Sequence, residues 1–328
     1  MMSTTRTLKF KVFRFNAETD YLPAYKTYEL DVNEHELMLD VLDKIKWTKD
    51  GSFSYRRSCR HGICGSCAIK VNGKSIIACK DNVFELADLF ETDELTIEPS
   101  RKERAIKDMI VDKKDFWSKY DAVKPYLIAE IDEHPVKENL VSPEDAEKID
   151  EADHCIQCGV CYYACPAVEV NPDFIGPAAL AKAARFTTDV RDEAKEERLS
   201  IVNELGSGIW DCVKCYECAT ACPKGVDPIG KITVLHQQTF EEGMAEDNVA
   251  TRHAVGFKHS IVRHGLLDET EIVRYSEGTF GMIKHMGVGL DMMRVGKVVM
   301  PWNMHNSKNL DEVKKLVKSS STTTFKGK

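Results

Sequence analysis

Apolar and polar residues alternate along two stretches near the start of the chain. Every second residue is apolar from Leu8 to Val12 and again from Tyr28 to Val32. Successive side chains of a β-strand point to opposite faces, so this alternation predicts two strands that are each buried on one face. The first hundred residues are therefore expected to form a small mixed domain.

A helix is expected directly after the second strand. Asn33 and Glu36 have the spacing of a capping box, and apolar residues then recur at helical spacing over residues 38–45. Further on, Asn72-Gly73 separates two short apolar runs. Asn-Gly favours a type I′ turn, so the two runs are predicted to pair as a hairpin that returns Cys79 toward Cys67.

The rest of the chain has helical rather than alternating periodicity. Residues 104–126 have a charged helical pattern, Gly176-Pro177 opens another helix with proline in its first turn, and the end of the chain from Ser319 is a low-complexity tail. The fold class is α+β. The expected parts are a mixed domain at 1–105, a connecting helix and linker at 106–140, an all-α domain at 141–238 and a helical C-terminal extension at 239–328.

Composition excludes several classes of function. The chain has 328 residues with 43% hydrophobic and 30% charged content and a net charge of −8, which is ordinary for a globular protein and gives no basic surface for nucleic acid. No stretch approaches the ~18 apolar residues that a membrane-spanning helix needs. Any contact with a membrane is therefore expected to be peripheral or to go through a partner.

Twelve cysteines fall into three groups of four, with none left over. Because an iron–sulfur cluster is normally held by four thiolates, this arrangement predicts three clusters and makes disulfides the weaker interpretation. The first group has the C-x4-C-x2-C spacing of plant-type [2Fe–2S] ferredoxins on a glycine-rich loop, whose backbone N–H groups we expect to face the cluster. Structural zinc is the alternative. The four residues are Cys59, Cys64, Cys67 and Cys79.

The other two groups are copies of one motif, C-x2-C-x2-C-x3-C-P, which begins at Cys155 and again at Cys212. In two-cluster ferredoxins the fourth cysteine of this motif binds the other cluster, so the spacing predicts crossed ligation. One [4Fe–4S] cluster is then expected on Cys155, Cys158, Cys161 and Cys222. The third cluster is expected on Cys165, Cys212, Cys215 and Cys218.

The loop from Arg56 to Cys67 and the segment from Cys222 to Pro228 closely resemble those of succinate dehydrogenase and fumarate reductase iron–sulfur subunits, and the resemblance covers roughly residues 6–238. It implies a β-grasp [2Fe–2S] ferredoxin domain followed by an all-α ferredoxin-like domain. It also implies an electron-transfer subunit, without a catalytic site of its own, that relays electrons between an FAD-containing flavoprotein with the dicarboxylate site and quinone.

Two departures from the family pattern concern the third cluster and the quinone site. An apolar residue is usual where this chain has Cys215, and there the third cluster is [3Fe–4S]; a fourth thiolate favours [4Fe–4S] instead. Val213 replaces a common histidine, and Ala167 and Val168 stand where aromatic residues are common. The quinone-site residues of the family therefore do not carry over to this chain.

The region around residues 253–271 and the motif at Cys155 are similar to an iron–sulfur subunit of heterodisulfide reductases that works beside a cysteine-rich partner. Together these features resemble the subtype with a cysteine-rich, CCG-motif third subunit, as in methylmenaquinol:fumarate reductases, rather than a membrane bundle. We expect a peripheral subunit of a respiratory complex at the bacterial inner membrane. The cytoplasmic face is the default, and co-export with the flavoprotein would place it on the periplasmic face.

Residues outside the cysteine motifs have weaker interpretations. The histidines of the last ninety residues show no tight ligand spacing, which favours surface or interface roles over metal binding. The methionine-rich segment 281–300 suits either partner docking or core packing. Arg56, Arg57 and Arg60 suit either pairing with a flavoprotein or simple solvation. The five histidines are His253, His259, His264, His285 and His305.

Two other functions compete with the leading one. A heterodisulfide-reductase-like or glycolate-oxidase-like subunit is not expected to carry the N-terminal loop that ends in Cys67. A free soluble ferredoxin would shuttle electrons without a fixed complex.

Overall fold

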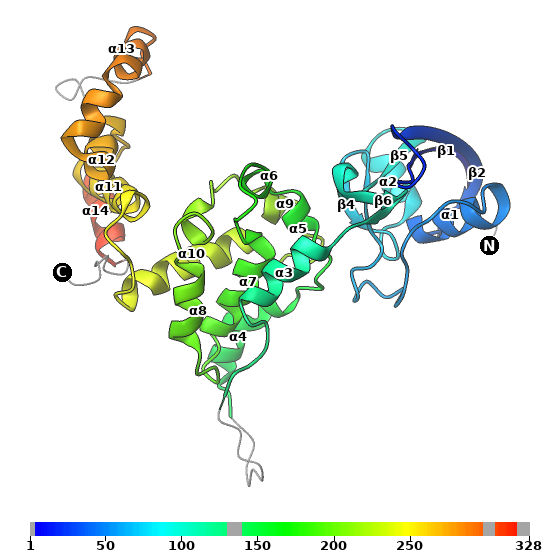
Figure 1. Cartoon of the computed structure of the whole chain (residues 1–328), viewed down its shortest axis with the longest axis horizontal. Helices are drawn as coiled ribbons and strands as arrows, with labels where there is room; N and C mark the ends of the chain where they lie inside the picture. Colours follow the sequence, from blue (N-terminus) through cyan, green and yellow to red (C-terminus); the bar gives the residue numbers. More distant parts are fainter. Residues whose placement is uncertain (1–3, 130–139, 298–305, 320–328) are drawn as a thin grey trace. The chain divides into compact units, whose positions relative to one another are not determined.

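The computed structural model describes residues 4–129, 140–297 and 306–319 (Figure 1). The chain divides into two compact units, the first reaching Ile232 without residues 203–205, and the second containing those three residues and the chain from Thr233 onward. Helix α10 (Pro228–Glu241) begins in the first unit and continues in the second. The predicted boundary at residue 238 therefore falls inside a helix.

A five-stranded mixed sheet forms the N-terminal part of the first unit. β1 pairs with β2 antiparallel and with β5 in parallel, while β3 pairs antiparallel with β5 and β4, which gives the order β2-β1-β5-β3-β4. Both alternating runs are strands, as predicted, and Leu8, Phe10 and Val12 are completely buried. The strands are β1 (Thr5–Arg14), β2 (Ala24–Asn33), β3 (Ala68–Val71), β4 (Lys74–Ile77) and β5 (Glu94–Pro99).

The predicted hairpin is confirmed. β3 and β4 pair in antiparallel register, and both turn residues, Asn72 and Gly73, have positive φ, at 47° and 82°, as a type I′ turn requires. The side-chain oxygen of Asn72 also accepts a hydrogen bond of 2.7 Å from the backbone N–H of Thr96. The turn is thereby tied to β5.

The first helix begins later than its sequence suggested. Its N-cap is Leu37, whose backbone N–H donates to the Asp40 carboxylate at 3.0 Å. Asn33 and Glu36 do face each other, with 2.5 Å between the Asn33 amide nitrogen and a Glu36 oxygen, but they close the turn that precedes the helix. The predicted capping box at Asn33 was therefore wrong. The elements here are α1 (Met38–Lys44), the π-helical turn η1 (Ile45–Lys49) and, after the hairpin, α2 (Val83–Leu89).

Residues 104–126 are only partly helical, which corrects the predicted charged helix. A two-stranded sheet precedes the helix because Asp108, with φ of 48° and 2% exposure, forms a turn. Its carboxylate accepts hydrogen bonds from the backbone N–H groups of Phe15 and Ser54, which hold the turn against the large sheet. The elements are η2 (Lys102–Arg104), β6 (Ala105–Lys107), β7 (Ile110–Val111) and α3 (Lys114–Ala122).

The remainder of the first unit is helical in the part of the chain that the structure describes. α7 starts at Gly176 with Pro177 in its first turn, as predicted, and it contacts α3, α4, α5 and α8. Alanine is its commonest residue, so its neighbours approach closely. The elements are α4 (Pro143–Asp153), α5 (Val160–Tyr163), α6 (Pro166–Val170), α7 (Gly176–Thr187), α8 (Lys195–Val202), η3 (Ile209–Asp211) and α9 (Glu217–Thr220).

The second unit is a helical assembly in which α11 contacts both α12 and α14. A Cβ added at Gly256 of α11 would lie 2.7 Å from Cβ of Tyr275 in α12, so this glycine lets the two helices cross closely. Within the described residues, no helix is long and apolar enough to cross a membrane. The helices after α10 are α11 (Val249–His264), α12 (Glu269–Lys284), α13 (Met286–Arg294) and α14 (Leu310–Ser319).

Several described side chains of the methionine-rich segment are exposed in this unit. Ile283, Met286 and Val288 are exposed by 66%, 61% and 61%, and docking to a partner stays a prediction. Residues 298–300 of the segment, His305 and the tail from residue 320 lie outside the described residues.

Arg198 of α8 forms a completely buried ion pair with the loop before that helix and also reaches the segment after α3. Arg198 and Asp192 have side chains with 0% exposure and lie 2.8 Å apart. The guanidinium also donates to the backbone oxygens of Val123, Lys124 and Tyr126. Several backbone carbonyls and one carboxylate thus depend on this single cation.

We expect Arg198→Met to destabilise the first unit strongly, because it leaves Asp192 as an unpaired buried charge. Breaking a buried pair in this way typically costs ~3–5 kcal/mol. The matched control is Lys148→Met, since the Lys148–Asp145 pair is exposed and should contribute less than ~1 kcal/mol. Anaerobic thermal unfolding measures both; equal losses would show that the buried pair has no special role.

Candidate metal centres

The first cysteine group lies at one end of the β3–β4 hairpin. Cys67 directly precedes β3 and Cys79 follows β4, and the backbone N–H of Ala78 donates to the Cys67 oxygen at 3.2 Å. The predicted return of Cys79 to Cys67 is therefore confirmed. Cys59 and Cys64 lie on the loop before the hairpin, and Cys59 is within reach of that loop's N–H groups.

Backbone N–H groups of this loop point at cysteine sulfur atoms. His61 and Cys64 each donate to Sγ of Cys59 at 3.4 Å, and Gly62 donates to Sγ of Cys79 at 3.2 Å. The hydrogen bonds from His61, Ile63 and Cys64 lower the pKa of Cys59 to about 6. Such donors stabilise negative charge on sulfur, which suits a thiolate ligand of iron.

Asp43 of α1 forms ion pairs with two arginines of this loop. Its carboxylate is 2.6 Å from Arg57 and 2.7 Å from Arg60, and it also accepts a hydrogen bond from Tyr55. The side chain of Asp43 is 5% exposed. Arg57 and Arg60 are therefore paired within the chain, and neither interpretation offered from the sequence, a flavoprotein contact or solvation, included this partner.

The two copies of the second motif have the same backbone conformation. Gln157 and Gly159 have positive φ in the first copy, as do Lys214 and Tyr216 at the equivalent positions of the second. A short helix begins directly after each of these pairs, α5 in one copy and α9 in the other. The left-handed residues curve each loop tightly, so the sequence repeat is also a structural repeat.

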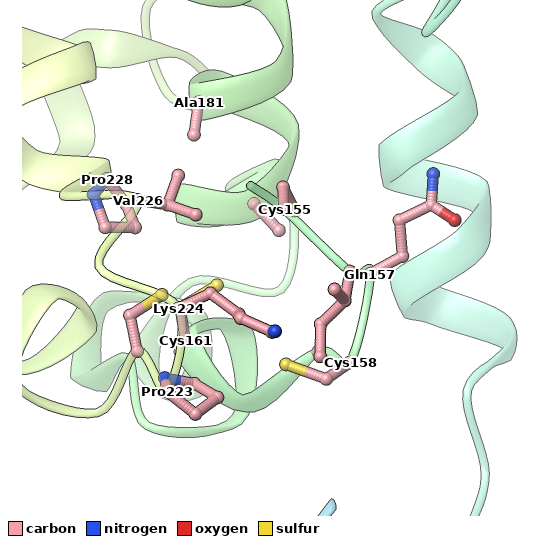
Figure 2. Close-up of a pocket in the computed structure, with 13 residues that line it drawn as sticks. Cys155, Gln157, Cys158, Cys161, Ala181, Pro223, Lys224, Val226 and Pro228 are labelled. Atoms are coloured by element: carbon pink, nitrogen blue, oxygen red, sulfur yellow. The ribbon is translucent and has the colours of Figure 1, made fainter. Parts of the chain in front are cut away.

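One hollow in the first unit is lined by cysteines from both copies (Figure 2). Its empty volume is about 400 Å³. Gln157 lies on its rim, and its amide donates to the Tyr120 hydroxyl of α3 at 3.1 Å. The cysteines that line it are Cys155, Cys158 and Cys161 of the first copy and Cys222 of the second.

A second hollow has the complementary set of cysteines. Its empty volume is about 310 Å³, and Phe174, Ile229 and Ile232 contribute apolar wall. Its cysteines are Cys165 of the first copy and Cys212, Cys215 and Cys218 of the second. Each copy thus supplies three cysteines to one hollow and its fourth to the other.

Burial makes these cysteines costly to ionise without a cation. It raises the pKa of Cys158 to about 11 and that of Cys218 to about 12, and nearby cysteines add to both shifts. All twelve cysteines are free of disulfides. Four thiolates in such a hollow need compensating positive charge, which the iron of a cluster supplies, so the donor sets fit iron–sulfur clusters.

The first loop touches the first copy of the repeat directly. A Cβ added at Gly65 would lie 2.7 Å from Cα of Cys158 and 2.8 Å from the Ile156 oxygen. Lys113 lies at the same junction and donates to the Cys158 backbone oxygen at 2.8 Å. Sequence reasoning missed Asp43, Lys113 and this contact, because each joins residues that are distant in the chain.

Family models match both cysteine regions. The 2Fe-2S iron-sulfur cluster binding domain matches residues 9–118, and the 4Fe-4S dicluster domain matches residues 151–226. The fold and the cysteine sites therefore define an iron–sulfur protein with a [2Fe–2S] domain followed by a helical [4Fe–4S] domain. Cysteines of the helical part also fit a third cluster.

Curated relatives identify the family. A fumarate reductase iron-sulfur subunit of Mycobacterium tuberculosis is 39% identical and aligns over 68% of this chain and 88% of its own length. A succinate dehydrogenase iron-sulfur subunit of Coxiella burnetii is 38% identical over 72% of this chain and 98% of its own length. The chain belongs to the succinate dehydrogenase and fumarate reductase iron–sulfur subunit family.

A solved structure has the same fold. A chain of the Mycobacterium smegmatis Sdh1 complex in the apo form aligns with a TM-score of 0.64 and 22% identity, over 74% of this chain and 98% of its own length. The α+β architecture expected from the sequence is thus confirmed.

We expect Gly65→Ala to lower the free energy of unfolding more than Gly62→Ala does. The two glycines have φ of +65° and +69°, so each alanine should cost ~1–2 kcal/mol in backbone strain. Only Gly65→Ala also drives a methyl group into the backbone of Cys158, which should add ~1–3 kcal/mol. At Gly62 the nearest atoms are side-chain atoms 3.8 Å and 3.9 Å away.

Anaerobic thermal unfolding and the visible absorbance of the [2Fe–2S] cluster measure the difference. Equal destabilisation of the two variants would contradict a tight contact between the first loop and Cys158.

Proposed function

We propose that this subunit relays electrons between an FAD-containing flavoprotein, which holds the dicarboxylate site, and quinone or quinol. The observation that carries this proposal is the presence of three groups of four cysteines in one compact unit, two of which line separate hollows. When bound, the clusters accept and donate electrons without proton or hydride chemistry of the protein. The residues described here hold and shield the clusters rather than act on substrate.

We propose that each group of four cysteines ligates one cluster. Cys59, Cys64, Cys67 and Cys79 hold [2Fe–2S]; this assignment is supported by the N–H donors to Cys59 and Cys79. The crossed sets at the two hollows hold the other clusters. We also propose the division into parts at 1–105, 106–140, 141–238 and 239–328, with the last boundary inside α10.

We propose [4Fe–4S] for the third cluster. Cys215 occupies the same position in its loop as Cys158 does in the other copy, and both loops share their backbone conformation. Cys215 also lines the same hollow as its three companions. A fourth thiolate in that place supports a complete cubane.

The partner proposal rests on the second unit. Phe280, Ile283, Met286 and Val288 are exposed by 85%, 66%, 61% and 61%, and methionine-rich apolar surfaces adapt well to partners. We propose a cysteine-rich third subunit as this partner and a peripheral position at a bacterial inner membrane. The membrane face follows from whether the flavoprotein is exported.

Cys215→Ala should convert the third cluster to [3Fe–4S], because it removes one of four iron ligands. We expect a strong low-temperature EPR signal in the oxidised variant that is absent from the anaerobically prepared parent. Val170→Ala is the control, since Val170 ends α6 with 85% exposure and does not line this hollow, so it should leave the spectrum unchanged. A native [3Fe–4S] signal that survives anaerobic reconstitution would refute the cubane.

Purification of the tagged full chain from its native membranes should bring down an FAD-containing flavoprotein. In that complex succinate is expected to reduce the clusters, whereas the isolated chain should show no dicarboxylate turnover. Absorbance, flavin content and EPR measure the outcome. Recovery of a cluster-loaded chain without any flavoprotein would instead favour the soluble ferredoxin carrier.

A further inference from the structure

A buried carboxylate in the second unit has one oxygen without a partner. Glu271 lies in the first turn of α12 with a side chain only 9% exposed. Its Oε1 is 3.0 Å from Nδ1 of His259 and 3.1 Å from the guanidinium of Arg263. Its Oε2 is buried and has no hydrogen-bond partner among the described residues. A buried, unpaired carboxylate oxygen carries a full desolvation penalty, so it needs a cation or a proton.

Two other potential metal ligands surround this carboxylate. Asp268, 8% exposed, is the N-cap of α12 and uses one oxygen, Oδ1, for the N–H groups of Thr270 and Glu271. His264 lies in the last turn of α11. One ligand atom from each of His264, Asp268 and Glu271 lies within 4.8 Å of the other two, so small side-chain rotations would bring all three to a single ion.

The hydrogen bond of His264 suits a metal ligand. Its Nδ1 is 3.1 Å from the side-chain oxygen of Asn306. Because an amide oxygen only accepts, Nδ1 carries the proton in this contact and the lone pair of Nε2 is left for a metal. Ligating histidines commonly have such a second partner, which fixes the tautomer and the orientation of the ring.

The local charge also favours a cation. Two buried carboxylates lie close together and repel each other, while the one guanidinium, Arg263, is 62% exposed and meets only Oε1 of Glu271. His259 meets the same oxygen. On the side of Glu271 toward Asp268 and His264, the described groups therefore carry more negative than positive charge.

We propose that His264, Asp268 and Glu271 bind one divalent transition-metal ion, with one imidazole nitrogen and two carboxylate oxygens as protein ligands. Zn²⁺ and Mn²⁺ accept this donor set. The ion joins the end of α11 to the start of α12. Through Asn306 and the 2.8 Å hydrogen bond from the Ser307 N–H to the His264 oxygen, it also holds the segment that leads into α14.

Every ligand of this site lies in the second unit and outside the cysteine motifs. The sequence indicated surface or interface roles for these histidines because only their spacing along the chain was considered. Asp268 and Glu271 complete the set from the neighbouring helix, so the histidines by themselves gave no signal.

Titration of the full-length, cluster-loaded protein with Mn²⁺ tests the proposal. Mn²⁺ is the probe because thiolates bind it weakly, and room-temperature EPR reports the free ion. We expect one Mn²⁺ per chain, displaced by Zn²⁺. Glu271→Gln and His264→Ala should each weaken Mn²⁺ binding at least tenfold, with cluster absorbance and helical circular dichroism unchanged.

The matched control is Glu277→Gln. Glu277 lies on the same helix and pairs with His285 at 3.2 Å, but no third ligand joins that pair among the described groups. We expect this variant to bind Mn²⁺ as the parent does. His264→Ala leaves the contacts of Glu271 with His259 and Arg263 intact, so it remains informative if Glu271→Gln fails to fold.

Three outcomes would overturn the proposal: no stoichiometric Mn²⁺ binding, binding that survives both ligand variants, or equal loss in the control. In the first case Arg263 and His259 alone hold Glu271. Failure here would leave the electron-transfer function untouched, because cluster content and flavoprotein binding are measured separately.

Discussion

The structure depends on bringing four cysteine sulfurs to one place three times over. Left-handed residues such as Gln157 and Lys214 curve each repeat loop tightly, and the crossing then sends Cys165 and Cys222 to the hollow of the opposite copy. Neither loop can complete its own site. The two halves of the helical region therefore share both hollows, and loss of one loop opens both of them.

The first cysteine group contains two different environments. At Cys59 backbone N–H groups lower the pKa of the thiol to about 6, whereas burial raises the pKa of Cys67 to about 12, much as it raises that of Cys158 in the helical region. The loop around Cys59 thus favours a thiolate before any metal binds, and the buried cysteines of all three groups need a cation for charge balance. Asp43 also holds Arg57 and Arg60 of the first loop through its buried carboxylate.

Structural features that residues close together in the sequence determine were predicted correctly. Asn72-Gly73 predicted the hairpin because both turn positions need positive φ, and the motif spacing predicted which cysteines share each hollow. Predictions were wrong where a distant partner decides the structure. Asp108 turns residues 105–111 into a small sheet by binding the N–H groups of Phe15 and Ser54, and no pattern near Asp108 could reveal those partners.

The contact between Gly65 and Cys158 explains why the sheet domain and the helical region form one unit. Cys158 and Val160 belong to the same buried cluster as the core of the sheet, so the second centre's loop completes the hydrophobic core of the first domain. A glycine is required at residue 65 because any side chain would overlap the backbone of Cys158. The packing that stabilises the domain junction therefore also places the first two cysteine sites next to each other. Electron transfer between adjacent centres needs that proximity, and here it follows from core packing rather than from a flexible linker.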